Sequence, residues 1–377
     1  MTPIEITTRL ATEVLDPMKR AFVGKDEVID LLGICLVGGE NLFILGPPGT
    51  AKSALVNQLA ARMEGRTFDY LLTRFTEPNE LFGPFDIRKL RDGELMTNTE
   101  GMLPEASLVF LDELLNANSA ILNSLLVALN ERVFRRGKET RPLAALMFVG
   151  ASNHLPEDDA LNALFDRFLL RVHCDNVPGE RLTDVLTAGW KLAGGSTAKS
   201  ALHFDDLRST QSALANVELA AIRQPFAELV HRIRHAGIAV SDRRAVKLQR
   251  VIAASALLSG RSEARLSDLW VVRHIWDTEE QQEVLASLVD QAINKQSPAA
   301  GDHPRARSAD GPDTESLARD LDAIAESLKN NALPDVEKAY LRDRLGVLEG
   351  RCQWVKEAAK REWLVKRISE LWPGLKA

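Results

Sequence analysis

The sequence reads Gly46-Pro47-Pro48-Gly49-Thr50-Ala51-Lys52-Ser53 between a short apolar run, Asn41–Leu45, and a helical pattern, Lys52–Met63. This order of apolar run, glycine-rich loop and helix is the context of a phosphate-binding loop, whose usual pattern is G-x-x-x-x-G-K-[ST]. Ala51 stands where that pattern has its second glycine. A glycine-proline turn with a chance lysine is the alternative. The flanking strand and helix favour the phosphate-binding loop, and residues 46–53 are called the phosphate loop below.

Each part of the phosphate loop has a chemical role. Backbone N–H groups at the start of a helix, together with the helix dipole, bind phosphate oxygens. Lys52 would reach the β- and γ-phosphates of ATP, and the Ser53 hydroxyl would be a ligand of Mg²⁺. The methyl group of Ala51 is a small intrusion that could slow turnover or tune affinity. The candidate nucleotide-binding residues are Gly46, Pro47, Pro48, Gly49, Thr50, Ala51, Lys52, Ser53 and Ala54.

Two further apolar runs end in polar residues. The run Leu108–Leu111 ends in Asp112 and Glu113, and carboxylates at the tip of a buried strand are costly unless something positive meets them. Asp112 would hold Mg²⁺, partly through water, and Glu113 would polarise the attacking water as the general base. The alternative is a helix N-terminus, where acids are also favoured. Asn153 ends the run Leu146–Ala151 and would orient the water or sense the γ-phosphate, although asparagine also starts turns.

The pattern along the chain predicts an α/β fold followed by helices. Short apolar strands between helices indicate a parallel sheet with helices on both faces. From Phe204 to Ile293 only helical spacing remains. Gln296–Pro312 is rich in proline, glycine, alanine and serine, which is typical of a flexible linker. Apolar residues then recur at helical spacing on both sides of a turn at Asn330–Pro334, which predicts a helical hairpin or short coiled coil, either an internal staple or a docking surface. The expected domains are 1–190 (nucleotide-binding), 191–295 (helical lid), 296–312 (linker) and 313–377 (hairpin).

Composition narrows the class of protein. The net charge of -6 argues against a general nucleic-acid binder. Cys35, Cys174 and Cys352 lack metal or disulfide spacing, which favours a reducing compartment. No stretch approaches the ~20 apolar residues needed to span a bilayer, and the N-terminus does not have the pattern of a secretory signal. We therefore expect a cytoplasmic protein.

The three motifs, in this order, resemble those of an AAA+ ATPase. The segments Phe68–Ile87 and Glu100–Arg132 resemble the MoxR family, and Val240–Trp276 resembles the helical domain of its RavA (regulatory ATPase variant A) subgroup. A phosphate loop that ends in Ala-Lys-Ser is also similar to that subgroup. The resemblance covers roughly residues 8 to 293. RavA-like proteins have a β-rich insertion in the C-terminal part that is missing here, so its function is not transferred.

The resemblance implies further roles. Arg167 matches the arginine finger, which would reach the γ-phosphate bound to a neighbouring subunit; from the residues alone, an ion pair with Asp166 is the alternative. Arg243 matches the second sensor, which would contact the nucleotide from the helical lid and couple hydrolysis to lid movement, with Arg244 as the substitute. The insertions Pro84–Leu103 and Val133–Ala145 would face a pore or a client, or be exposed hairpins with solvated charges.

The resemblance also implies the activity. It predicts an ATP hydrolase that needs Mg²⁺ and forms a homo-oligomer, a ring of six subunits. This ring would remodel or chaperone a protein client together with a partner that carries a von Willebrand factor A domain. One alternative is a nucleic-acid motor or loader, for which Arg135 and Arg136 are the best argument. The other is a scaffold that acts through the helical tail and is switched by ATP.

Overall fold

The computed structural model describes residues 1–91, 94–194, 199–297, 299–306, 314–328, 335–352 and 358–375. They belong to two compact units, Met1–Arg307 and Ser308–Ala377. Among these residues, no helix combines the length and the apolar character needed to cross a lipid bilayer.

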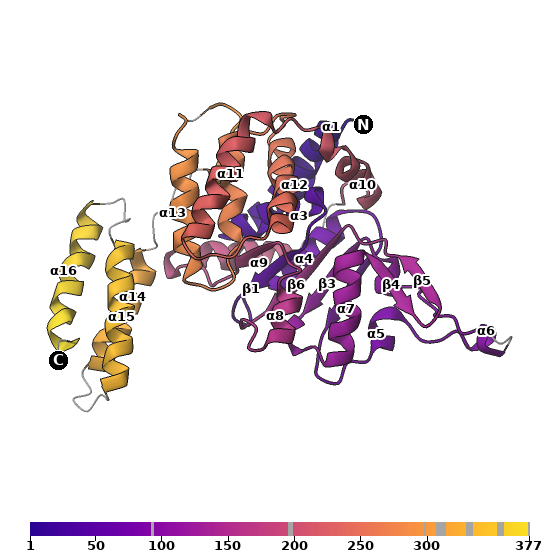
Figure 1. The fold of residues 1–377 in the computed structure, drawn as a ribbon, viewed down its shortest axis with the longest axis horizontal. Helices are drawn as coiled ribbons and strands as arrows, with labels where there is room; N and C mark the ends of the chain where they lie inside the picture. Colours follow the sequence, from indigo (N-terminus) through magenta and orange to yellow (C-terminus); the bar gives the residue numbers. More distant parts are fainter. Residues whose placement is uncertain are drawn as a thin grey trace. The chain divides into compact units, whose positions relative to one another are not determined.

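The first unit is built on a parallel sheet of five strands in the order β2-β3-β6-β1-β7 (Figure 1). The inner strands are buried along their length because helices lie on both faces of the sheet. This confirms the α/β class and places the three motifs at one edge, since parallel strands end on the same side. The strand bounds are β1 (Leu42–Leu45), β2 (Thr67–Leu71), β3 (Leu108–Asp112), β6 (Met147–Ser152) and β7 (Leu170–His173).

Local signals explain where the helices around the sheet begin and end. The Asn118 side chain accepts hydrogen bonds from two N–H groups at the start of α7, and Asp158 caps α8 in the same way. Gly39, with a φ of 70°, ends α3 in the left-handed region. These elements are α1 (Pro3–Arg9), η1 (Leu10–Leu15), α2 (Asp16–Ala21), α3 (Asp26–Gly38), α4 (Lys52–Arg62), α5 (Pro78–Phe82), η3 (Leu114–Asn116), α7 (Ser119–Glu131) and α8 (Asp159–Phe165).

Two insertions leave the sheet region. β4 (Val133–Arg136) and β5 (Glu139–Pro142) pair as the antiparallel hairpin expected within Val133–Ala145. The other insertion, Pro84–Leu103, carries the short helix α6 (Ile87–Arg91), reaches far from the sheet in Figure 1 and leads to η2 (Leu103–Glu105).

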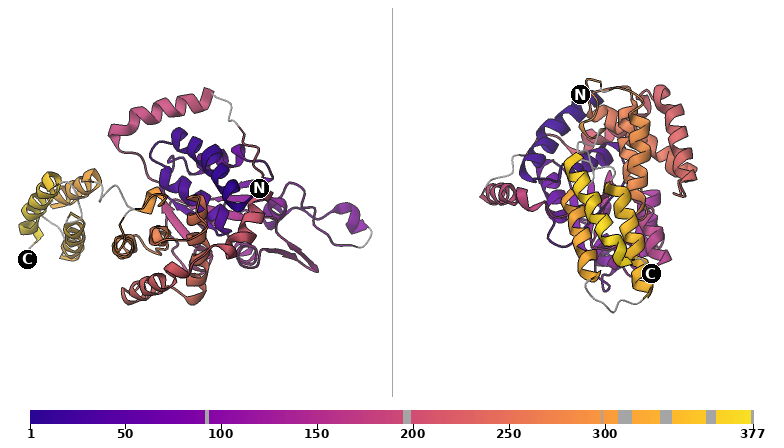
Figure 2. Two further views of the ribbon diagram at one scale, coloured as in Figure 1. Left: turned by 90° about the horizontal axis from the view of Figure 1, so that it is seen from above. Right: turned by 90° about the vertical axis from the view of Figure 1, so that its left-hand side faces the viewer.

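The helical domain, α10 to α13, belongs to the same compact unit as the sheet. The N-terminal helix α1 contacts α10 and α12, and the Thr7 hydroxyl donates to Leu257 O at 2.9 Å. One compact unit therefore spans both expected domains, and the division at residue 190 stays a prediction. The preceding helix α9 buries none of its side chains and lies at the periphery of the unit in the left view of Figure 2, where it contacts α2. The bounds are η4 (Gly179–Arg181), α9 (Leu182–Gly194), α10 (Phe204–Ala213), η5 (Leu214–Asn216), α11 (Ala220–His235), α12 (Asp242–Leu258), η6 (Leu266–His274) and α13 (Gln281–Ile293).

Residues 299–306, called the strap below, correct the expectation of a flexible linker over 296–312. Arg305 pairs with Asp30 of α3 (Nε–Oδ2 3.1 Å), and Arg273 donates to Arg305 O at 2.8 Å. The His303 ring is buried and stacks on Trp270 with the ring centroids 4.6 Å apart. The strap includes η7 (Pro304–Ala306). Its polar composition suggested a linker, but these polar groups have partners on distant elements. The rest of the expected linker includes residues 298 and 307–312, which lie outside the described residues.

The strap predicts a pH-dependent stability. Burial holds the pKa of His303 at about 4, below the ~6.5 of an exposed histidine. The unfolded chain therefore binds a proton first, and stability should fall as the pH drops from about 6.5 toward 4, by up to about 1.4 kcal/mol per pH unit. Urea unfolding of wild type and His303→Phe at pH 7, 6 and 5 measures this, since phenylalanine keeps the stacking without the proton. Parallel curves would contradict it.

The second unit is helical, as expected, but it has three helices rather than a hairpin. α14 (Thr314–Leu328), α15 (Asp335–Cys352) and α16 (Ala358–Leu375) pack against one another. The third helix supplies Leu364 and Ile368, which close the apolar face left by the first two. The turn expected at Asn330–Pro334 lies outside the described residues. The buried core is Leu317, Leu321, Ile324, Leu341, Leu345, Leu348, Cys352, Leu364 and Ile368.

Candidate nucleotide site

The phosphate loop connects the end of β1 to the start of α4. Gly46 is required by close packing, since a Cβ there would lie 2.3 Å from Cys174 O on the strand-end beside it. Gly49 has a φ of 82°, and a Cβ there would meet no atom within 4 Å. The loop therefore faces open space at Gly49. Thr50 closes the turn from within, because its hydroxyl donates to Pro47 O at 2.9 Å.

Ala51, the departure from the usual motif, has a φ of 72° and a ψ of 22°. This is the left-handed conformation that glycine adopts freely, and an alanine there costs roughly 1–2 kcal/mol. The loop thus keeps the backbone geometry of the usual motif although the residue does not favour it.

Ala51→Gly is therefore expected to stabilise the first unit by about 0.5–1 kcal/mol, because the relieved strain exceeds the extra entropy of glycine in the unfolded chain. Chemical denaturation of wild type and variant measures the change. Ala54→Gly, three residues further along in the first turn of α4, is the matched control and should destabilise the unit by about 1 kcal/mol. An equal loss of stability in both variants would contradict backbone strain at Ala51.

Lys52 is a buried cation without a carboxylate partner among the described residues. It is 7% exposed, and its ammonium group donates to Gly46 O at 2.5 Å and to Pro47 O at 3.0 Å. Burying a charge is costly unless it is paired, and carbonyl oxygens compensate it only in part. Such a lysine at the start of α4 fits the negative charge of a nucleotide's phosphates.

Ser53 and Asp112 lie together at the same edge. The Ser53 hydroxyl donates to Asp112 Oδ2 at 2.6 Å, and Asp112 Oδ1 accepts from the Glu113 N–H at 3.0 Å. Hydroxyl and carboxylate oxygens are ligands that Mg²⁺ prefers, and Mg²⁺ takes few protein ligands alongside substrate phosphates and water. These two oxygens therefore fit the predicted metal role. Glu113 itself has a φ of 51°, which turns the chain away from β3 into η3.

Asn153 lies beside the phosphate loop. Leu45 and Ser152 are partners in the parallel pair of β1 and β6, and the Gly46 N–H donates to Ser152 O at 3.1 Å. Asn153 follows directly and is exposed. The structure thus brings Lys52, Ser53, Asp112, Glu113 and Asn153 to the carboxyl edge of the sheet.

Arg167 lies at the opposite edge. Its carbonyl oxygen accepts from Asn41 Nδ2 at 3.0 Å, and Asn41 precedes β1, whereas the phosphate loop follows β1. The guanidinium group is 3.7 Å from Asp166, a long contact with a largely exposed acid. Its Nε is buried and has no hydrogen-bond partner in the part of the chain that the structure describes.

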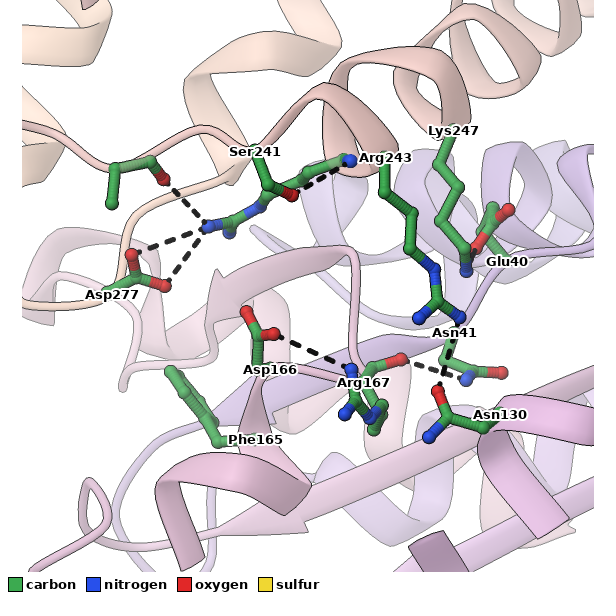
Figure 3. Close-up of polar contacts among 12 residues, drawn as sticks. Glu40, Asn41, Asn130, Phe165, Asp166, Arg167, Ser241, Arg243, Lys247 and Asp277 are labelled. Carbon is green, nitrogen blue, oxygen red and sulfur yellow. Dashed lines mark hydrogen bonds and ion pairs between the residues drawn. The ribbon is translucent and has the colours of Figure 1, made fainter. Parts of the chain in front are cut away.

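Arg243 is at this opposite edge as well, and its expected role as the second sensor stays a prediction. Arg243 Nη2 donates to Asn130 Oδ1 at 3.3 Å, and Arg132, two residues further, donates to Asn41 Oδ1 at 2.7 Å. Figure 3 shows the Arg243 side chain extending from α12 toward Asn130 and Arg167. The docking of the helical domain, which the sequence does not show, places Arg243 there.

Sequence reasoning missed the residues that produce this docking. Arg171 of β7 is fully buried and pairs with Asp277 (Nη1–Oδ1 2.6 Å), and Arg244 of α12 pairs with the same carboxylate at 3.3 Å. Burial, followed by the nearby Arg244, lowers the pKa of Arg171 to about 9. Because Arg244 is buried and paired with Asp277, Arg243 is the exposed candidate for the second sensor. An arginine within the apolar strand Leu170–His173 was the signal available in the sequence.

Two family profiles match this chain. A profile for the MoxR domain in the MoxR-vWA-beta-propeller ternary systems matches residues 8–212, and an AAA lid domain profile matches residues 218–289. The chain belongs to the MoxR family of AAA+ ATPases. The uncharacterized protein MJ0079 of Methanocaldococcus jannaschii is 34% identical over 75% of this chain and 74% of its own length.

Two further proteins are similar to this chain at lower sequence identity. Chaperone MoxR1 of Mycobacterium tuberculosis is 27% identical over 41% of this chain and 42% of its own length. A candidate ATPase from Cytophaga hutchinsonii, solved as a crystal structure, shares the fold with a TM-score of 0.64 at 19% identity, covering 78% of this chain and 96% of its own. AAA+ membership implies ATP binding, in agreement with the phosphate loop.

Proposed function

We propose that this MoxR-family chain hydrolyses ATP with Mg²⁺ in a cytoplasmic ring of identical subunits, most simply six, and uses the energy to remodel a protein client. The observation that carries the proposal is the division of the site between two edges of the sheet. Lys52, Ser53, Asp112 and Glu113 lie at one edge, and Arg167 lies at the other.

This division favours assembly. A chain cannot bring its own Arg167 to its own phosphate loop, because β1 separates them. A head-to-tail contact places the Arg167 edge of one subunit against the loop edge of the next, and such a contact closes into a ring or continues as a helix. Arg243 lies on the same edge as Arg167 and would reach the same neighbouring nucleotide.

The chain's own residues then have distinct roles. When bound, ATP with Mg²⁺ supplies the phosphoryl group and the cation that polarises it. Lys52 would offset phosphate charge, Ser53 and Asp112 would hold the cation, and Glu113 would accept the proton of the attacking water, which Asn153 would orient. Arg167 of the neighbour adds positive charge where negative charge develops.

The name of the matched family profile supports a partner protein. The matched profile is named after ternary systems of MoxR, a von Willebrand factor A protein and a β-propeller protein. We therefore propose a von Willebrand factor A partner for this chain, with a β-propeller protein as a third component. A RavA-like specialisation rests on the alanine of the phosphate loop and the segment Val240–Trp276.

The hairpin arginines give little support to a nucleic-acid motor. Arg135 pairs with Glu131 at 2.5 Å, and Arg136 donates to Gly83 O at 2.8 Å while its guanidinium lies 3.8 Å from the centre of the Phe85 ring. Both arginines are engaged within the chain, whereas phosphate binding needs available cations.

The proposal is tested by affinity purification of the Glu113→Gln variant from native extract, in ATP and in ADP. A von Willebrand factor A protein retained only in ATP is the expected result. A variant ending at Arg307, the last residue of the first compact unit, tests the scaffold alternative, since a remodeller keeps its turnover and ring without the second unit. Co-purified nucleic acid, or no ATP-dependent partner, would overturn the partner assignment.

A further inference from the structure

Asp277 joins the helical domain to the sheet. Its carboxylate accepts from Arg171 of β7 (Nη1–Oδ1 2.6 Å) and from Arg244 of α12 (Nη1–Oδ1 3.3 Å and Nη1–Oδ2 3.4 Å). Arg171 is fully buried, and Arg244 is 9% exposed. These three residues are called the latch below.

Backbone contacts reinforce the latch. Arg171 Nη1 also donates to Trp276 O at 2.8 Å and to Ile275 O at 3.2 Å, and Arg244 Nη2 donates to the same Ile275 O at 2.5 Å. Two guanidinium groups from different parts of the unit therefore hold one short segment, 275–277. Three donor nitrogens, Arg171 Nη1 and both Nη atoms of Arg244, hold this segment far more firmly than a single surface ion pair would.

The latch touches the elements that carry Arg167 and Arg243. Arg171 Nη2 donates to Phe165 O at 3.3 Å, and the Arg171 guanidinium lies 4.1 Å from the centre of the Phe165 ring, two residues before Arg167. On the other side, Arg244 is the direct neighbour of Arg243 at the start of α12. Figure 3 shows Asp277, Arg167 and Arg243 in this arrangement.

Separating the helical domain from the sheet would leave Arg171 buried without its carboxylate. Breaking a buried ion pair by removing one partner is strongly destabilising, because the remaining charge is uncompensated. The helical domain is thereby tied to its own sheet, contrary to a lid that swings over the nucleotide of its own chain.

We propose that Asp277 is a positioning residue that holds Arg243 beside Arg167, so that both arginines reach a neighbouring subunit's nucleotide as one rigid pair. The inference rests on the proposed function, in which Arg167 acts between subunits. Asp277 touches neither nucleotide, and its effect passes through Arg244 and Arg171.

Asp277→Asn tests this, because asparagine keeps the size and loses the charge. We expect turnover to fall about 10–100-fold, the cost of misplacing a charged group by roughly 1 Å, with ATP affinity of the chain's own loop unchanged. Asp242→Asn is the matched control, an exposed acid one residue from Arg243 that pairs with Arg234 at 2.7 Å. The control should keep wild-type turnover.

Mixed rings separate positioning from a general loss of structure. Glu113→Gln subunits lack the base but carry an intact arginine pair. In random 1:1 mixtures with Asp277→Asn subunits, about a quarter of the head-to-tail contacts combine an intact base with an intact pair. Turnover should therefore rise well above the sum of the two variants alone. Arg167→Ala mixed with Glu113→Gln is run in parallel and should recover in the same way.

The outcomes are distinguishable. If turnover recovers in mixtures with Arg167→Ala but not with Asp277→Asn, the positioning role of the latch is overturned and the action of Arg167 between subunits stands. Recovery with neither would overturn the action of Arg167 between subunits, and with it the proposed function. Wild-type turnover of Asp277→Asn alone would also overturn the latch. If Asp277→Asn fails to fold, Arg244→Lys decides by the same mixtures, since lysine keeps the charge but cannot donate to both Asp277 and Ile275 in the same geometry.

Discussion

Glu113→Gln is expected to lower ATP turnover about 10²–10⁴-fold while ATP still binds. The glutamine side chain has nearly the same shape but cannot accept the proton of the attacking water. ATP binding should persist because the phosphate loop and the Ser53–Asp112 pair do not depend on Glu113; their 2.6 Å contact is made by other atoms. Steady-state phosphate release and the binding of a fluorescent ATP analogue measure the two effects separately.

Glu100→Gln is the matched control for this prediction. Glu100 is exposed on the loop before η2, and its replacement should leave turnover unchanged. Near-normal turnover of Glu113→Gln would assign the general base to another group. Loss of both turnover and ATP binding would mean that Glu113 supports the structure of the site instead of acting on water.

The sequence was sufficient to predict those parts of the site whose position follows from the order of strands, loops and helices along the chain. A phosphate loop lies between a strand and a helix, Asp112 ends β3, and Asn153 follows β6 of the same parallel sheet. Parallel strands end at one edge, so motifs far apart in sequence meet there without further information. The left-handed φ of 72° at Ala51 was not among the expectations, because the loop imposes it and alanine does not favour it.

The position of Arg243 could not be predicted in this way. It depends on how the helical domain docks, and the docking depends on Arg171 and Asp277, which are far apart in the sequence and recognisable as partners only once the chain is folded. The strap has the same origin. The composition of residues 299–306 predicted a linker, whereas Arg305 pairs with Asp30 of α3 and His303 stacks on Trp270 of η6.

Arg167→Ala is expected to lower turnover about 10³–10⁵-fold, the range measured for arginine fingers. The loss should be catalytic and not structural. The guanidinium makes one long contact of 3.7 Å with Asp166, so its removal breaks little within the subunit, and an exposed pair of this kind is worth about 0–1 kcal/mol. Arg167→Lys should recover part of the turnover, because the ammonium group keeps the charge but loses the planar fork. Arg223→Ala, on the exposed face of α11, is the control.

The same variant tests the ring through protein concentration. If Arg167 acts on a neighbouring subunit, wild-type turnover per subunit should rise with concentration as the head-to-tail contact forms, and Arg167→Ala should stay low at every concentration. Turnover and particle mass, measured over one dilution series, should rise together. Full turnover per subunit in a particle with the mass of one chain would contradict this, because β1 keeps Arg167 and the phosphate loop of one chain at opposite edges of the sheet.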